Sequence, residues 1–169
     1  MLKFTLATFG IVALLLLGAL LGGIWVWLSL IYITVFAYGF DCLTPILLAN
    51  ADPDSEFPAS DRLSAALAIA HFVVLSIVVY SLAQSDALGL LEKIVLFFAT
   101  SLFAGQIGHP NAHELINRSE RPLRRLGKAT YMSILMGHNA AANPLVQHVY
   151  VGPPNDPVFE PKGRGFWHT

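Results

Sequence analysis

The stretch "LKFTLATFGIVALLLLGALLGGIWVWLSLIYITVFAYGF", residues 2–40, decides the fold class of this chain, and its one charged residue is Lys3. This run is longer than the roughly 20 apolar residues that span the hydrocarbon core of a bilayer. The glycine pair at 22–23 is the one break in the run that favours a turn. We therefore predict a transmembrane helical hairpin, about 3–21 and 24–42, with a single bent span as the alternative.

A secretory signal is the other interpretation of the first segment, because Lys3 precedes a leucine-rich run. The apolar stretch continues well past the usual length of a signal core, and no Ala-x-Ala-like cleavage site ends it, so we favour a span. The single cysteine, Cys42, allows no internal disulfide.

The rest of the composition also predicts a membrane protein. Of the 169 residues, 55% are hydrophobic and 12% are charged. Between residues 65 and 108 the charged residues are Asp86, Glu92 and Lys93. This second apolar region predicts another hairpin, about 62–83 and 88–108, joined by a short turn. The expected fold is an all-α integral membrane protein of about four spans.

Charge places the ends of the four predicted spans. The N-terminus, an acidic loop at 50–61 and everything after residue 108 fall on one side of the membrane, together with most of the basic residues: Lys3, Arg62, Arg118, Arg121, Arg124, Arg125, Lys128, Lys162 and Arg164. By the positive-inside rule this side is cytoplasmic. We therefore expect a multi-pass protein of a bacterial inner membrane, with both termini cytoplasmic. A net charge of −1 argues against nucleic acid as a partner.

Two regions follow from this arrangement. Residues 1–110 are predicted to form the transmembrane bundle, and residues 111–169 a cytoplasmic region. That region begins with a basic, partly amphipathic stretch, "RPLRRLGKATYMSILMG" at 121–137, which we expect to lie along the membrane interface against lipid headgroups. The remainder, 143–169, is rich in Pro and Gly and predicts an extended tail.

Histidines are the candidate chemical groups. His71 lies inside a predicted span, where a hydrogen-bonded interhelical role is the simpler interpretation and ligation of a pigment or haem the alternative. His109, His113 and Asn117 are spaced by four, so they share one face if the helix continues past Pro110, which could kink it. Further along the chain are two more histidines near enough to join a mononuclear metal site, His138 and His148.

Several motifs give the chain a family resemblance. "NAHELINR" at 111–118, "GHNAAANPLVQHVYVGPPNDP" at 137–157 and "KGRGFW" at 162–167 resemble the membrane-bound alkane 1-monooxygenases, relatives of integral-membrane fatty acid desaturases and hydroxylases. The resemblance implies a helical bundle capped on the cytoplasmic side by histidines that hold two irons. It also implies a rubredoxin-type electron donor and hydroxylation of a terminal methyl group.

The family's ligand positions are only partly kept. His113 takes the first ligand position of the H-E-x-x-H motif and Asn117 the second. In the next motif Asn143 and Gln147 stand at ligand positions, and His148 alone is kept. An amide can hydrogen bond as an imidazole does, but it is a much poorer iron ligand.

Length is the other departure from the family, whose enzymes carry more spans and a later histidine cluster. Any ligands from that half would have to come from a second polypeptide. Natural loss, engineered removal of ligands and misassigned residues each account for the amides, and the short chain favours natural loss. We predict a non-catalytic accessory or scaffold subunit of a larger membrane complex, with other membrane proteins and lipid as partners and no cofactor. The alternative is an iron-dependent hydroxylase, or half of one.

Overall fold

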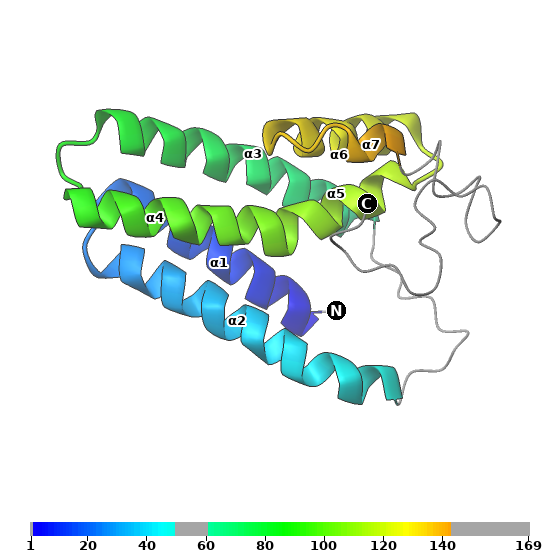
Figure 1. Cartoon of the computed structure of the whole chain (residues 1–169), viewed down its shortest axis with the longest axis horizontal. Helices are drawn as coiled ribbons and strands as arrows, with labels where there is room; N and C mark the ends of the chain where they lie inside the picture. The colour runs from blue at the N-terminus through cyan, green and yellow to red at the C-terminus, as the bar shows by residue number, and fades with distance from the viewer. Residues whose placement is uncertain (1, 50–60, 143–169) are drawn as a thin grey trace, which may run out of the picture.

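The computed structural model describes residues 2–49 and 61–142, and every regular element in these ranges is a helix. Figure 1 shows the long helices α1–α4 as a bundle, with α5, α6 and α7 gathered towards one end. The predicted all-α class is confirmed for these ranges, whereas most of the acidic loop and the predicted tail lie outside the described residues. The helices are α1 (Leu2–Leu21), α2 (Ile24–Ala49), α3 (Asp61–Gln84), α4 (Leu90–Phe103), the π-helix η1 (Ala104–Gly108), α5 (His109–Ile116), α6 (Arg121–Ser133) and α7 (Asn139–Ala142).

Both predicted hairpins form. Gly22 and Gly23 connect α1 to α2 with φ angles of 65° and 61°, in the left-handed region that glycine enters without a steric penalty. Residues 85–89 connect α3 to α4. The two turns lie at the same end of the bundle (Figure 1).

Glu92, in the first turn of α4, joins these two turns. Its Oε2 accepts a hydrogen bond from the backbone N–H of Gly89 at 3.0 Å, as an N-terminal helix cap does. Its Oε1 accepts another from the backbone N–H of Gly23 at 3.0 Å. One carboxylate therefore satisfies a donor in each hairpin.

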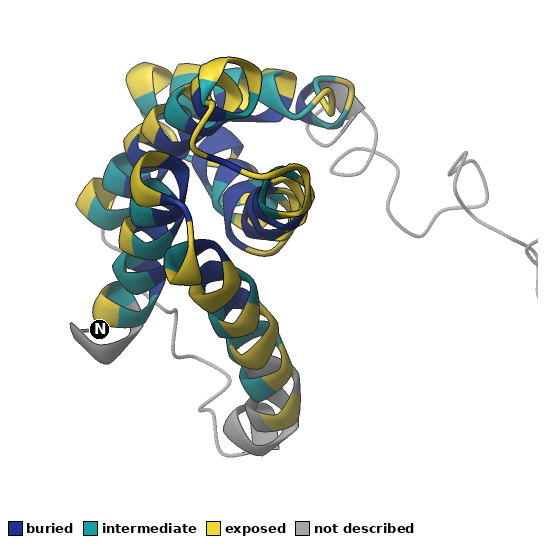
Figure 2. Cartoon of the chain, turned by 90° about the vertical axis from the view of Figure 1, so that its left-hand side faces the viewer, coloured by how far each residue is buried: buried dark blue, intermediate teal, exposed yellow. Residues whose placement is uncertain are grey.

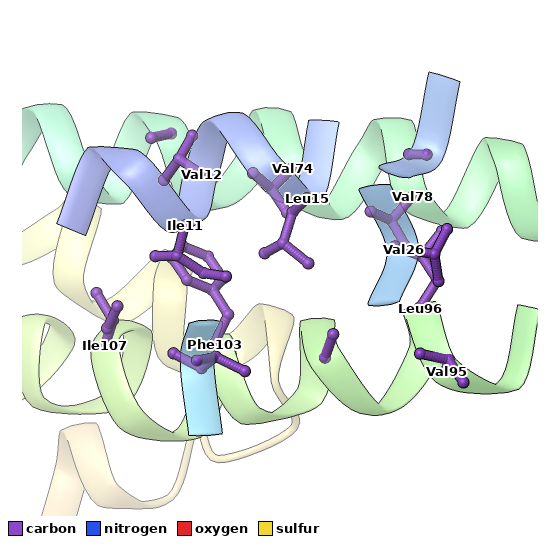
Figure 3. Close-up of a cluster of buried hydrophobic side chains, with 14 of the residues drawn as sticks. Ile11, Val12, Leu15, Val26, Val74, Val78, Val95, Leu96, Phe103 and Ile107 are labelled. Carbon is purple, nitrogen blue, oxygen red and sulfur yellow. The ribbon is translucent and has the colours of Figure 1, made fainter. Parts of the chain in front are cut away.

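The main core lies between α1, α2, α3 and α4. Figure 3 shows side chains from these helices meeting, with Ile11 and Leu15 of α1 among those that are fully buried. Figure 2 shows the buried faces of the helices turned towards one another and the exposed faces turned outward. Many of the outward side chains are large and apolar, including Leu20, Ile31 and Leu90.

Within residues 2–49 and 61–142, two helices are long and apolar enough to cross a membrane. One is Asp61–Gln84, and the other runs through Leu90–Ile116, from α4 across η1 into α5. Shorter apolar stretches, Thr5–Leu21 and Ile24–Gly39, lie within α1 and α2. The two long helices suggest membrane association, and the four spans stay a prediction.

The last predicted span ends at residue 108, but the helix continues to Ile116. Pro110 does not stop it. A proline has no N–H and its ring clashes with the carbonyl four residues earlier, here that of Gln106. Gln106 lies in the π-helical turn η1, which widens the helix where the clash would fall. The helix therefore also continues across the predicted boundary between the two regions at residue 110.

Helices α5 and α6 form a second, smaller hairpin with its own core. They pack tightly at Gly127, where an added Cβ would lie 2.8 Å from Leu115 Cβ and 2.9 Å from the carbonyl oxygen of Ala112. Figure 1 shows α6 beside α3 and roughly parallel to it. The predicted amphipathic helix thus exists, and it runs along the bundle instead of across its end.

Candidate functional site

Four of the predicted histidines, His71, His109, His113 and His138, lie within the described residues, near the end of the bundle where α5, α6 and α7 meet. His109, the first residue of α5, is partly buried, and its ring contacts the ring of Tyr131 on α6 edge-to-face, with centroids 5.2 Å apart. Its Nε2 lies 3.5 Å from Nδ2 of Asn139, the first residue of α7. The imidazole therefore links three helices.

Tyr131 is almost fully buried between these helices, at 1% exposure. Burial raises the pKa of its phenol above the ordinary value, because the charged phenolate loses its hydration. The ring is thus a neutral packing partner of His109 across the physiological pH range.

His113 lies one turn further along α5 and is exposed. Asn117, at the end of the helix, donates from Nδ2 to the backbone carbonyl of His113 at 3.0 Å, and the same nitrogen lies 3.5 Å from His113 Nδ1. The structure thus brings His113 and Asn117 together, as the spacing of four predicts. Asn117 is the C-cap residue of α5.

His138 is exposed in the turn before α7. The other motif positions, Asn143, Gln147 and His148, lie outside the described residues. Within 2–49 and 61–142, no group of three or more His, Cys, Asp or Glu side chains is placed to share a metal ion. The described part of the chain does not, by itself, fit the iron cage that the resemblance implies.

His71 is a hydrogen-bonded interhelical histidine, the simpler of the two interpretations of its sequence position. It is 2% exposed, and its Nε2 lies 2.9 Å from Oγ of Ser133, the last residue of α6. Ser133 Oγ also donates to the carbonyl of Thr130 at 2.7 Å, which uses its single proton. The hydrogen-bond network therefore assigns the proton to Nε2, which donates to Ser133.

The other ring nitrogen of His71 faces the π-helix. Nδ1 is buried and has no hydrogen-bond partner among the described residues. A Cβ added to Gly108 would lie 2.9 Å from it, so glycine there permits the close contact. The ring also stacks on Phe103, with centroids 6.1 Å apart. Neither nitrogen has open space beside it, which disfavours ligation of a pigment or haem.

An apolar groove of about 660 Å³ lies beside these residues. It is bounded by α3, α4, η1 and the segment that follows α6. Its polar lining groups include His109 and Ser133, and most of its wall is aliphatic or aromatic: Leu75, Val78, Val79, Leu82, Phe97, Ile134, Leu135 and Met136. This shape and lining suit a hydrocarbon chain with a small polar end.

Ion pairs fix the far end of α5. Arg118 contacts Glu114 four residues earlier along the chain, and its Nε also lies 3.2 Å from Asp61 Oδ1 at the start of α3. Nearby, Asn111 donates to the carbonyl of Ser64 at 2.9 Å. These contacts hold α5 against α3.

Sequence reasoning identifies the histidines but misses their partners. Ser133, Tyr131 and Asn139 come from segments far along the chain, and no local spacing marks them as partners. The only local signal is that Asn139 directly follows His138 in a motif already singled out.

The chain matches no family model, no curated protein and no solved structure.

Proposed function

We propose that this chain is a membrane-embedded, non-catalytic accessory or scaffold subunit of a larger complex of the bacterial inner membrane. Photosynthetic and respiratory complexes are the candidates, because they recruit small helical subunits. The main observation in support is the apolar outer surface of the bundle, where Leu20 is 66% exposed and Leu90 is 78% exposed. Contiguous apolar surface of this kind marks a lipid or protein contact.

The hydroxyl groups of the bundle support a membrane environment. Ser29 Oγ donates to the carbonyl of Val26 at 2.7 Å, and Thr100 Oγ1 to that of Leu96 at 2.8 Å. Ser101 Oγ does the same to Phe97 at 2.8 Å although it lies on an exposed face. A hydroxyl that donates to a backbone carbonyl of its own helix has its hydrogen bond without water. Such a group can therefore face lipid hydrocarbon at little cost.

The amide at Asn117 supports the non-catalytic part of the proposal. It stands one turn from His113, at the place where the resembling family has an imidazole, and its nitrogen is directed at the backbone carbonyl of His113. A side-chain amide keeps the hydrogen bonds of such a position but not the affinity for iron.

Copurification tests the proposal. The full chain, tagged and expressed in its own membrane, is extracted in mild detergent and separated by native electrophoresis. We expect it to migrate with other integral membrane proteins in a stable complex. Migration as the single chain, at every detergent concentration that keeps it folded, would contradict the accessory role.

A second candidate is a hydroxylase, or half of one, that needs another chain. The observation in its favour is that His109 borders the 660 Å³ apolar groove, one helical turn from His113. On this view the groove holds an alkyl chain and a rubredoxin-type partner supplies electrons. Iron and zinc analysis of the purified chain decides between the two candidates. A metal content close to zero rejects the hydroxylase. Bound iron that is lost in a His113→Ala variant would favour the hydroxylase over the accessory subunit.

A further inference from the structure

The first two turns of α6 carry a stripe of cations. Four basic residues recur at spacings of three and four, so their side chains share one face of the helix. With one residue from α5 and one from α7 they line a pocket of about 380 Å³, here called the basic pocket: Arg121, Arg124, Arg125 and Lys128, with Ile116 and Ala140.

The cations of the basic pocket have no carboxylate partners in the described part of the chain. The ion pairs found there both belong to Arg118, which engages Glu114 and Asp61. Glu120 precedes the stripe as an exposed residue at the N-cap of α6 and forms no ion pair within these ranges. Among the described residues, the pocket therefore gathers positive charge that no ion pair compensates.

Backbone electrostatics add to this excess. The N-terminal end of a helix carries a partial positive charge, and cations in the first turns are unfavourable there. Arg121 and Arg125 are also like charges one turn apart, as are Arg124 and Lys128. An anion in the pocket would relieve both effects. Three guanidinium groups offer paired N–H donors that match the oxygens of a phosphate group.

The position of the pocket indicates which phosphate compound it meets. Arg118, three residues before α6, pairs with Asp61 at the start of α3, and the last residue of α6, Ser133, bonds to His71 on the same helix. The cations thus lie at the end of a candidate membrane-spanning helix, at the level of lipid headgroups if the bundle is embedded. Ile116 provides an apolar wall beside them.

We propose that the basic pocket binds the phosphate headgroup of an anionic phospholipid, with a phosphomonoester such as that of phosphatidic acid as the best match. The proposal rests on the membrane placement in the proposed function. The proposal goes further by naming the class of lipid that this part of the surface binds.

Lipid titration tests it. The full chain in nonionic detergent is titrated with fluorescent phosphatidic acid and, separately, with fluorescent phosphatidylcholine. We expect tighter binding of phosphatidic acid. An Arg124→Gln/Arg125→Gln double variant should weaken that binding roughly 25-fold, at about fivefold for each cation, and leave phosphatidylcholine unchanged. An Arg124→Lys/Arg125→Lys variant should keep much of the affinity, which separates loss of charge from loss of fold.

The matched control removes two positive charges elsewhere. Arg62→Gln/Lys93→Gln changes net charge equally but lies outside the basic pocket, so it should leave phosphatidic acid binding unaltered. Equal loss in both double variants, or loss in neither, overturns the proposal. Inorganic phosphate that displaces the lipid completely, at an affinity equal to the lipid's own, also overturns it and indicates a site for the free ion.

Alkaline carbonate extraction of membranes keeps this test separate from the proposed function. If carbonate releases the chain, the membrane placement fails whatever the titration gives. If the chain stays in the membrane and the variants bind phosphatidic acid as the parent does, the basic pocket alone is rejected.

Discussion

Replacing Gly127 by alanine tests the packing of α5 against α6 most sharply. In the middle of a helix this substitution ordinarily stabilises, by about 1 kcal/mol, because alanine is the better helix former. Here the added methyl group would lie 2.8 Å from Leu115 Cβ and 2.9 Å from both the carbonyl oxygen of Ala112 and the backbone nitrogen of Ile116. Two of these atoms belong to the backbone, so the helices themselves must separate.

The expected sign follows from comparing the two effects. Overpacking of a closed contact costs about 1–3 kcal/mol, which outweighs or cancels the gain in helix propensity. We expect a net loss of about 1 kcal/mol for Gly127→Ala. In a chain of this size that corresponds to a fall in melting temperature of about 2–4 °C.

Thermal unfolding in mild detergent, followed by circular dichroism, measures the loss. Gly39→Ala is the matched control, because it lies in α2 and an added Cβ there meets no atom of the described residues within 4 Å. That variant should be neutral or slightly more stable. Trypsin cleavage after the basic residues of α6 gives a local readout, and it should speed up only in the Gly127 variant. An increase in stability for Gly127→Ala, matching the control, would refute the close approach of α5 and α6.

The remaining predictions concern polar and titratable contacts. Glu92→Gln keeps one acceptor oxygen for two backbone donors, so it should lower the unfolding free energy by about 0.5–1.5 kcal/mol in the same melts, whereas Lys93→Gln should not. Ser133→Ala leaves a buried imidazole N–H on α3 without its acceptor and should cost about 1–3 kcal/mol, while Ser101→Ala, whose hydroxyl bonds only within its own helix, should cost little. Burial raises the pKa of Tyr131 above its ordinary value of 10.0. The stabilisation that the neutral phenol contributes to the unfolding free energy is therefore fully present below pH 10, and it is lost as pH rises through the higher pKa of the folded state. Melts across alkaline pH should show this decline, and Tyr131→Phe should lack it.

The helical class and both hairpins follow from the sequence because apolar length and paired glycines are local signals. Residues 2–40 contain the turn at Gly22 and Gly23, and the structure places it there. The predicted span ends at about residue 108 and leaves open whether the helix continues past Pro110, whereas the structure continues it to Ile116. A proline at position 110 usually breaks a helix, and the π-helical turn that accommodates it has no distinct local sequence signature.

Some contacts of the candidate site could likewise be predicted from the sequence, and others could not. The one-turn spacing of His113 and Asn117 follows from helical geometry, so their contact could be predicted. The links from His71 to Ser133 and from His109 to Asn139 join residues 62 and 30 positions apart. They depend on how α6 and α7 fold back along the bundle, which is a matter of tertiary packing, including the tight contact at Gly127. The basic pocket needs the same fold, although its spacing along α6 is visible in the sequence.

The shared carboxylate of Glu92 constrains how this sequence can vary. Because Gly23 and Gly89 both donate to it, the first hairpin keeps a fixed longitudinal position against the second. Inserting one residue in either turn would move a donor away from the carboxylate. Insertions and deletions should therefore be rare within the two turns, so that each hairpin is inherited as a unit of fixed length.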